Sequence, residues 1–204
     1  MDVVLIENIL SENDLKRIKD AIDHELLTRP IEKEDRPSDT NHRDDTILYW
    51  KDFGRIDIRW PKIPQDILDK IFNNVKEILK DEYPVLTSGL VIYAEYSTAT
   101  GGQPKLNAHF DISQARSLIL DYQLESNTLW GIGVEDKIFD LKDNSGILFD
   151  PTAKIHYRPQ KNFLDGEFVK LLFFRFDTAA EQEVHTEEDW LRLYNLAIKN
   201  GDSV

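Results

Sequence analysis

Three stretches of the chain space their apolar residues as one face of an α-helix does. Ser11, with Asp14 as its reciprocal partner, predicts an N-terminal cap for the first helix, Pro64 suits the first turn of the second, and Thr186 predicts a cap for the third. The apolar faces consist of Leu15, Ile18, Ile22 and Leu26; Ile67, Ile71, Val75 and Ile78; and Trp190, Leu193, Leu196 and Ala197. We therefore predict two packing helices in the N-terminal half and a C-terminal helix at about 186–199.

Elsewhere the pattern has a period of two residues, which is typical of strands. Ile56 and Ile58 alternate with charged Arg55 and Asp57, and from about residue 85 short apolar segments follow one another between Gly, Asn, Asp and Pro turn signals. Helices on one side of many short strands are typical of an α+β protein built on a β-sandwich or jelly roll. We predict one domain over residues 1–204, with helical support at 11–80 and a jelly-roll core at about 85–177.

Two further segments carry weaker signals. Residues 3–10 predict a short edge strand or an extended entry to the fold. Residues 28–45 are polar, contain two prolines and follow neither period, which predicts a long exposed loop. We expect this loop and the turn at 97–107 to flank the mouth of the jelly roll and to become ordered when a substrate binds.

Charge and cysteine content narrow the chemistry. The chain has 25 basic and 38 acidic residues, a formal charge of -13, which argues against a nucleic-acid partner because phosphate binding needs clustered Lys and Arg. It contains no cysteine, so any metal must be held by His, Asp or Glu. No apolar run approaches the ~20 residues of a membrane span, and the N-terminus lacks a basic signal region. We predict a cytoplasmic protein without a membrane anchor.

The candidate metal ligands come from the β-rich half. In an H-x-D triplet on a strand, His109 and Asp111 point to the same face, and His156 lies in a second strand-like segment further on. Two His and one Asp from separate strands make a facial triad, which leaves coordination positions open. Such ligands suit Fe(II), Mn(II) or Zn(II), and the spacing alone does not choose among them. The other histidines are interpreted as solvated side chains: His24, His42 and His185.

With an H-x-D triplet followed by a histidine in a later strand-like segment, the chain resembles the Fe(II)- and 2-oxoglutarate-dependent dioxygenases, and within them the prolyl 4-hydroxylase-like branch. The resemblance covers most of the chain, from VLIENILSENDLKRI through YAEYSTATGGQPKLNAHFD to HYRPQ and KLLFFRFD. It implies a double-stranded β-helix, or jelly roll, with Fe(II) inside its open mouth and with 2-oxoglutarate and dioxygen as co-substrates. It makes His109, Asp111 and His156 the iron ligands, and Tyr96 the residue whose hydroxyl helps to hold 2-oxoglutarate.

The sequence departs from this family where a cation should bind the distal carboxylate of 2-oxoglutarate. The family has Arg or Lys near the start of the last strand, but Phe168 occupies that position. Lys170 is two residues on, on the same side of the strand, and is the first candidate for the cation. Arg158 is the second, because it shares a strand face with His156. Arg175 is expected to point outward if the strand is unbulged.

The resemblance implies hydroxylation of a C–H bond in a peptidyl proline, in another residue or in a small molecule. Asp111 favours hydroxylation over halogenation, because relatives with a small residue there leave room for halide. A first alternative is a non-catalytic metal-binding jelly-roll protein that recognises a peptide or a small molecule, which the absent cation at Phe168 motivates. A second is a cupin-like sandwich with incidental histidines, ranked last because AHFDIS lacks a second histidine. The oligomeric state stays open.

Overall fold

The structure is a computed structural model, and it describes residues 1–34, 45–80, 82–83, 85–111, 115–181 and 184–202. The three predicted helices are confirmed as α1 (Glu12–Thr28), α2 (Gln65–Leu79) and α3 (Glu187–Asn200). Ser11 with Asp14, and Thr186 with Asp189, form capping boxes in which each side chain bonds the backbone N–H of the other residue. These local bonds fix where α1 and α3 begin, as the sequence indicates.

The strands form two sheets. The large sheet has the order β1-β10-β7-β12-β5-β4-β3-β2 and the small sheet the order β6-β11-β8-β9. The strands of the described residues are β1 (Val4–Glu7), β2 (Ile31–Glu34), β3 (Ile47–Trp50), β4 (Arg55–Arg59), β5 (Leu86–Ser97), β6 (Leu106–His109), β7 (Ala115–Ser126), β8 (Ile132–Val134), β9 (Lys137–Phe139), β10 (Ser145–Phe149), β11 (His156–Arg158) and β12 (Phe168–Glu181).

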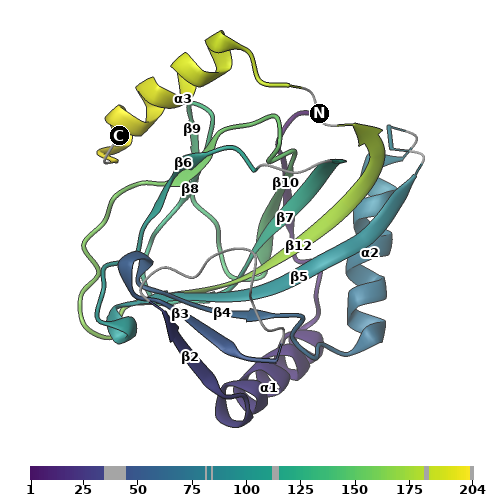
Figure 1. The fold of residues 1–204 in the computed structure, drawn as a ribbon. Coiled ribbons are helices and arrows are strands. Elements are labelled where there is room, and N and C mark those ends of the chain that lie inside the picture. The colour runs from purple at the N-terminus through teal and green to yellow at the C-terminus, as the bar shows by residue number, and fades with distance from the viewer. Residues whose placement is uncertain (35–44, 81, 84, 112–114, 182–183, 203–204) are drawn as a thin grey trace.

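The elements are arranged in layers around the two sheets. Helices α1 and α2 cover the outer face of the large sheet, whereas α3 lies beside the small sheet, where it contacts β6 (Figure 1). Except for β2 with β3, the paired strands are antiparallel. The predicted α+β jelly roll with N-terminal packing helices and a C-terminal helix is confirmed. No described helix has both the length and the apolar character that a membrane crossing needs.

The two faces of β12 show how the sequence separates the layers. Leu172 and Phe174 point outward into the main apolar cluster, which includes Ile18 of α1 and Ile71 of α2. The alternate residue Leu171 points inward, toward the space between the sheets. Because successive strand side chains face opposite sides, the apolar run of β12 serves both layers at once. The outer cluster supports the fold, and the inner face borders the candidate site.

Two predictions about the N-terminal half are modified. The edge strand predicted at 3–10 is confirmed as β1, at one end of the large sheet. The long loop predicted at 28–45 is wrong for residues 31–34, which form β2 at the opposite end of that sheet and pair in parallel with β3. The sequence IEKE contains one apolar residue, so it lacks the alternation that predicts a strand. Residues 35–44, with His42, lie outside the described residues.

Candidate metal centre

The three predicted ligands come from two paired strands of the small sheet. His109 ends β6, His156 begins β11, and these two residues are direct cross-strand partners. Asp111 follows β6, and its backbone N–H donates to the carbonyl of Pro151 at 2.9 Å. Phe110, between the two ligands of the triplet, is buried in a separate apolar cluster. The alternation predicted from H-x-D therefore places the imidazole and the carboxylate together.

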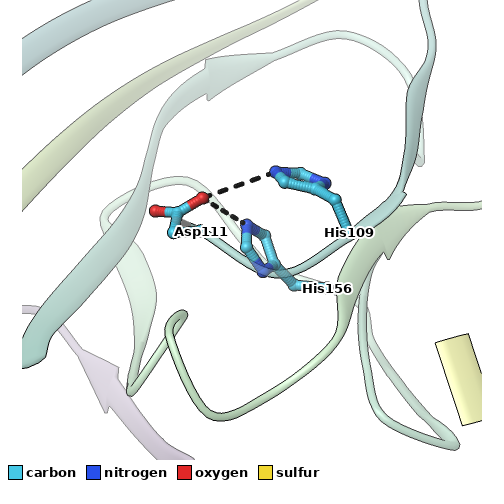
Figure 2. Close-up of side chains that lie close together, drawn as sticks. All are labelled: His109, Asp111 and His156. Carbon is cyan, nitrogen blue, oxygen red and sulfur yellow. Dashed lines mark ion pairs between the residues drawn. The ribbon is translucent and has the colours of Figure 1, made fainter. Parts of the chain in front are cut away.

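The three side chains converge on one point (Figure 2). Oδ1 of Asp111 lies 3.5 Å from Nε2 of His109 and 3.6 Å from Nε2 of His156. One potential ligand atom from each residue falls within 4.8 Å of the others, and this group of residues could hold a metal ion. His156 is buried, whereas the side chains of His109 and Asp111 are each 38% exposed, so the cluster is open on one side.

Backbone carbonyls orient both imidazole rings. Nδ1 of His109 lies 2.7 Å from the carbonyl oxygen of Asn107, and Nδ1 of His156 lies 3.3 Å from that of Lys154. With the proton on Nδ1, each ring donates to its carbonyl and directs the lone pair of Nε2 toward the shared centre. Such partners commonly fix the tautomer of a metal-binding histidine.

The electrostatic environment keeps His156 and Asp111 in the protonation states that a cation requires. Burial, together with the neighbouring His109, lowers the pKa of His156 to about 3, so its imidazole is neutral at pH 7. Burial by itself would raise the pKa of Asp111, but the bond with His109 and the charges of His156, His109 and Arg175 together hold that pKa below its ordinary value. Metal ligands must be deprotonated, and both groups meet that condition.

The triad lies at a cavity between the sheets. The cavity has a volume of about 170 Å³, and its described lining includes all three ligands together with Arg55, Asp121 and Phe173. A second cavity of about 310 Å³ adjoins it, because Arg55, Leu106 and His109 line both. The outer cavity adds the aromatic rings of Trp50 and Phe53, whose centroids are 6.2 Å apart.

The structure does not bring all predicted co-substrate residues to this cavity. Tyr96 is fully buried between the sheets, and its hydroxyl accepts a hydrogen bond from Nη1 of Arg55 at 3.0 Å. Arg158 points inward and its Nη2 donates to both oxygens of Asp121, at 3.1 and 3.2 Å. Lys170 instead points to the helix-bearing side, where its Nζ lies 3.3 Å from Glu125.

Arg175 and His185 differ from their sequence-based interpretations. Arg175 was expected to point outward because Lys170 was taken to point inward. β12 alternates regularly from Phe173 to Asp177 along β7, and Phe174 and Phe176 lie on the outer face, so Arg175 lies on the inner face, where its charge acts on Asp111. His185 was interpreted as solvated, but its ring stacks on Phe110 with centroids 4.0 Å apart. His24 is exposed on α1, as expected.

Sequence reasoning missed three charged residues on the inner face of the large sheet, of which Arg55 and Asp121 line the inner cavity. Arg55 and Asp57 alternate with Ile56 and Ile58 along β4, and that pattern was interpreted as a strand with a polar face. The charged face points inward instead, and Asp57 is 3% exposed. Asp121 gave the clearer signal, because it interrupts the otherwise apolar segment SLIL-D-Y of β7.

No protein-family model and no curated protein matches the chain. Solved structures do match. The viral collagen prolyl hydroxylase from Paramecium Bursaria Chlorella virus-1 matches with TM-score 0.56 and 14% identity, over 87% of this chain and 96% of that one. The alpha ketoglutarate dependent epimerase SnoN from nogalamycin biosynthesis matches with TM-score 0.63 and 8% identity, over 91% of this chain and 80% of that one.

A third match is a prolyl hydroxylase from Trichoplax adhaerens in complex with a hypoxia inducible factor peptide fragment. It gives a TM-score of 0.56 and 10% identity, over 86% of this chain and 83% of that one. At these identities the likenesses establish the fold. The resemblance inferred from the sequence is thereby confirmed at that level: the chain has the fold of Fe(II)- and 2-oxoglutarate-dependent oxygenases, including prolyl hydroxylases.

Proposed function

We propose that the chain is an Fe(II)- and 2-oxoglutarate-dependent oxygenase that hydroxylates a C–H bond. The observation that carries the proposal is the convergence of His109, Asp111 and His156 at a cavity between the sheets of this fold. In the overall reaction, one oxygen atom of dioxygen enters the substrate and the other enters succinate, while 2-oxoglutarate loses carbon dioxide.

The residues present fit Fe(II). Two imidazoles and one carboxylate, all on one side, form a ligand set that leaves further coordination positions available. His109, Asp111 and His156 would hold the metal. When bound, Fe(II) and 2-oxoglutarate together supply the activation of dioxygen, which protein side chains cannot provide. Asp111 occupies the ligand position that halogenating relatives leave small, so hydroxylation is the reaction we propose.

Other residues around the triad contribute to binding and exclude water. Phe149 and Phe173 line the wall beside the ligands, where they exclude water from the reacting centre. Tyr96 stays protonated because burial raises the pKa of its hydroxyl, so it can donate a hydrogen bond. We propose that it contributes to holding 2-oxoglutarate, as the sequence resemblance implies.

The adjoining outer cavity is the proposed site for the substrate. Its lining of Trp50, Phe53, Leu106 and Asn107 suits an apolar or ring-bearing group with one polar contact. A peptidyl proline meets this description, as does a small apolar molecule. The peptide complex of the Trichoplax adhaerens enzyme supports the peptide. The acidic composition favours a neutral or basic substrate over nucleic acid. A cytoplasmic location stays a prediction.

A second candidate function is a metal-binding protein without turnover. It is favoured by the pairing of both inner arginines with carboxylates, Arg55 with Asp57 and Arg158 with Asp121, which leaves the cavity without a net positive charge from these four residues. A co-substrate anion would then have to compete with groups of the protein itself. This candidate predicts binding of metal without formation of succinate.

One experiment separates the two candidates. Under anaerobic conditions, Fe(II) and 2-oxoglutarate added to the protein should give the weak visible absorption band of the chelate, and air should then yield succinate. Prolyl peptides and small apolar molecules are tested in parallel as accelerators of succinate formation. Absence of the band would contradict the oxygenase proposal. A band that never leads to succinate, with any substrate tested, would favour the binding protein.

A further inference from the structure

Among the described lining residues of the metal cavity, Arg55 is the cation. It begins β4 opposite Tyr96 of β5, and it lines both the inner cavity with the triad and the outer cavity. The turn before it depends on Gly54, which has φ of +55° and where an added Cβ would lie 2.4 Å from the backbone of Pro104. This close approach fixes the start of β4, and with it the direction in which Arg55 enters the cavity.

The guanidinium of Arg55 is held firmly but is not fully used. Nε lies 2.5 Å from Oδ1 of Asp57, and Nη1 donates to the hydroxyl of Tyr96. The group also lies over the ring of Phe173, with Cζ 5.4 Å from the centroid. Within the described parts of the chain, no residue accepts a hydrogen bond from Nη2. The side chain is 19% exposed, so a planar donor pair remains available on the cavity side.

The free donor of Arg158 is enclosed: among the described residues its Nε has no hydrogen-bond partner, but that atom is buried away from solvent. Its side chain is 0% exposed, Nη1 donates to the carbonyl of Trp130 at 2.6 Å, and Nη2 is shared between the two oxygens of Asp121. The guanidinium also lies against the ring of Trp130, with Cζ 5.1 Å from the centroid. An incoming carboxylate would have to displace both Trp130 and Asp121, which makes Arg158 a structural partner of Asp121.

Lys170 is excluded by the side of the sheet on which it lies. β12 pairs with β5 in unbroken register from Phe168 to Phe174, so Lys170 shares the outer face with Leu172. Its partner Glu125 also pairs with Lys19 of α1 at 3.2 Å, which places this ionic cluster under the helix. A bound anion in the cavity cannot reach Lys170 across the sheet.

We propose that Arg55, on β4, binds the distal carboxylate of the 2-oxo acid, with the Tyr96 hydroxyl as a second donor. This inference rests on the proposed function and names the residue that replaces the cation absent from Phe168. The metal takes the keto acid end, and Arg55 holds the opposite end across the inner cavity. Asp57 occupies Nε of Arg55 and leaves Nη2 for the anion. Charge-assisted hydrogen bonds to the distal carboxylate then give a preference on the order of 10- to 100-fold.

The test compares two ligands that differ in this one group. 2-Oxoglutarate and 2-oxopentanoate have the same chain length, and the latter lacks the distal carboxylate. Their dissociation constants for the anaerobic Fe(II)-loaded protein are measured from the visible chelate band. We expect the intact chain to bind 2-oxoglutarate about 10- to 100-fold more tightly. Arg55→Gln should remove this preference while Fe(II) affinity, measured by metal titration without any 2-oxo acid, stays unchanged.

Two further variants keep the test decisive. Arg55→Gln leaves Asp57 buried without its partner, so the double variant Arg55→Gln/Asp57→Asn repeats the test with the pair removed together, and circular dichroism checks that each variant is folded. Lys170→Gln is the matched control on the outer face and should retain the full preference. The inference is supported if both Arg55 variants lose the preference and Lys170→Gln retains it.

The outcomes distinguish the inference from the function on which it rests. A chelate band with equal affinity for the two acids in the intact chain would overturn the role of Arg55 and leave the oxygenase proposal standing. A preference that survives in the Arg55 variants, or that disappears in Lys170→Gln, would also overturn it. Absence of a band with either acid would instead remove the proposed function itself.

Discussion

The two faces of the large sheet bury different kinds of residue: apolar side chains on the outer face and ion pairs on the inner face. The outer face packs Leu172, Phe174 and Phe176 of β12 against the apolar faces of α1 and α2. The inner face buries the ion pairs of Arg55 with Asp57 and of Arg158 with Asp121. Apolar burial stabilises a fold by about 25 cal/mol per Å², whereas a buried ion pair seldom repays the desolvation of its charges.

The difference teaches which face carries stability and which carries binding. Burial raises the pKa of both Asp57 and Asp121, although the adjacent arginines oppose the shift. Charges in such positions are retained at a cost, and sites that bind ions or substrates are where such a cost is expected. The outer face should therefore tolerate no loss of volume without losing stability, and the inner face should tolerate changes in charge only in matched pairs.

The largest expected effect separates binding from stability. His156→Ala removes one of the three ligands and should weaken Fe(II) binding by more than about 100-fold, beyond the roughly 10- to 100-fold that is typical of losing a group behind a ligand. The fold should survive, because the outer face is untouched. Metal titration and thermal denaturation measure the two properties. His24→Ala, on the exposed side of α1, is the control; equal loss of affinity in both variants would contradict the assignment of the triad.

The next effect concerns the ion pair of the inner face. Arg158→Leu leaves the carboxylate of Asp121 buried without its partner and should lower the free energy of unfolding by about 3–5 kcal/mol. The double variant Arg158→Leu/Asp121→Leu removes both charges and should recover most of that loss or exceed the original stability. Urea denaturation at pH 7 measures both. A double variant as unstable as the single one would show that the pair itself stabilises the fold.

The same contrast explains what could be predicted from the sequence. The helices, the strand-rich half and the shared face of His109 and Asp111 follow from periodicity, caps and the H-x-D spacing, which are local signals. The jelly roll and the addition of His156 as the third ligand rested on the order of the motifs and on the family resemblance. Strand parity gives the face of Lys170 relative to its neighbours but not which face is interior, so it could not show that Lys170 lies on the helix-bearing side beside Glu125. In an apolar run such as that of β12 both faces are buried, so hydrophobicity does not distinguish them.

Contacts between residues of distant strands could not be predicted from the sequence. Arg55 and Tyr96 become neighbours through the pairing of β4 with β5, and Asp121 reaches Arg158 across the space between the sheets. Each of these contacts depends on the three-dimensional arrangement of the strands. The one-domain boundary of 1–204 stays a prediction.

A smaller effect tests the outer face. Ile18 of α1 is fully buried against the large sheet, and Ile18→Val removes one methylene there. The free energy of unfolding should fall by about 0.5–1.5 kcal/mol, while Fe(II) affinity stays unchanged. Urea denaturation and metal titration check the two values. A parallel loss of metal affinity would mean that the two faces are coupled through the sheet, contrary to the separation argued above.

The smallest effect lies at the rim of the outer face, where Asp14 connects the two helices. Its Oδ2 accepts hydrogen bonds from Nζ of Lys70 in α2 at 2.6 Å and from the hydroxyl of Ser11 at 2.8 Å. These bonds, that of Lys70 first, lower the pKa of Asp14 from 3.8 to about 2. The unfolded chain therefore binds this proton more readily, and the contribution of Asp14 to stability is complete above pH 3.8 and is lost as the pH falls through about 2.

Asp14→Asn keeps the shape of the cap but removes the charge. The difference in unfolding free energy between the original chain and the variant should be constant from about pH 5 to 7, where carboxyl groups are ionised in both states. It should close as the pH falls toward about 2. Urea denaturation across this range measures the gap. Glu12→Gln, in the same helical turn, controls for the loss of an acid near the helix N-terminus. A gap that persists in acid would show that the geometry of the cap, and not the charge that attracts Lys70, holds α1 to α2.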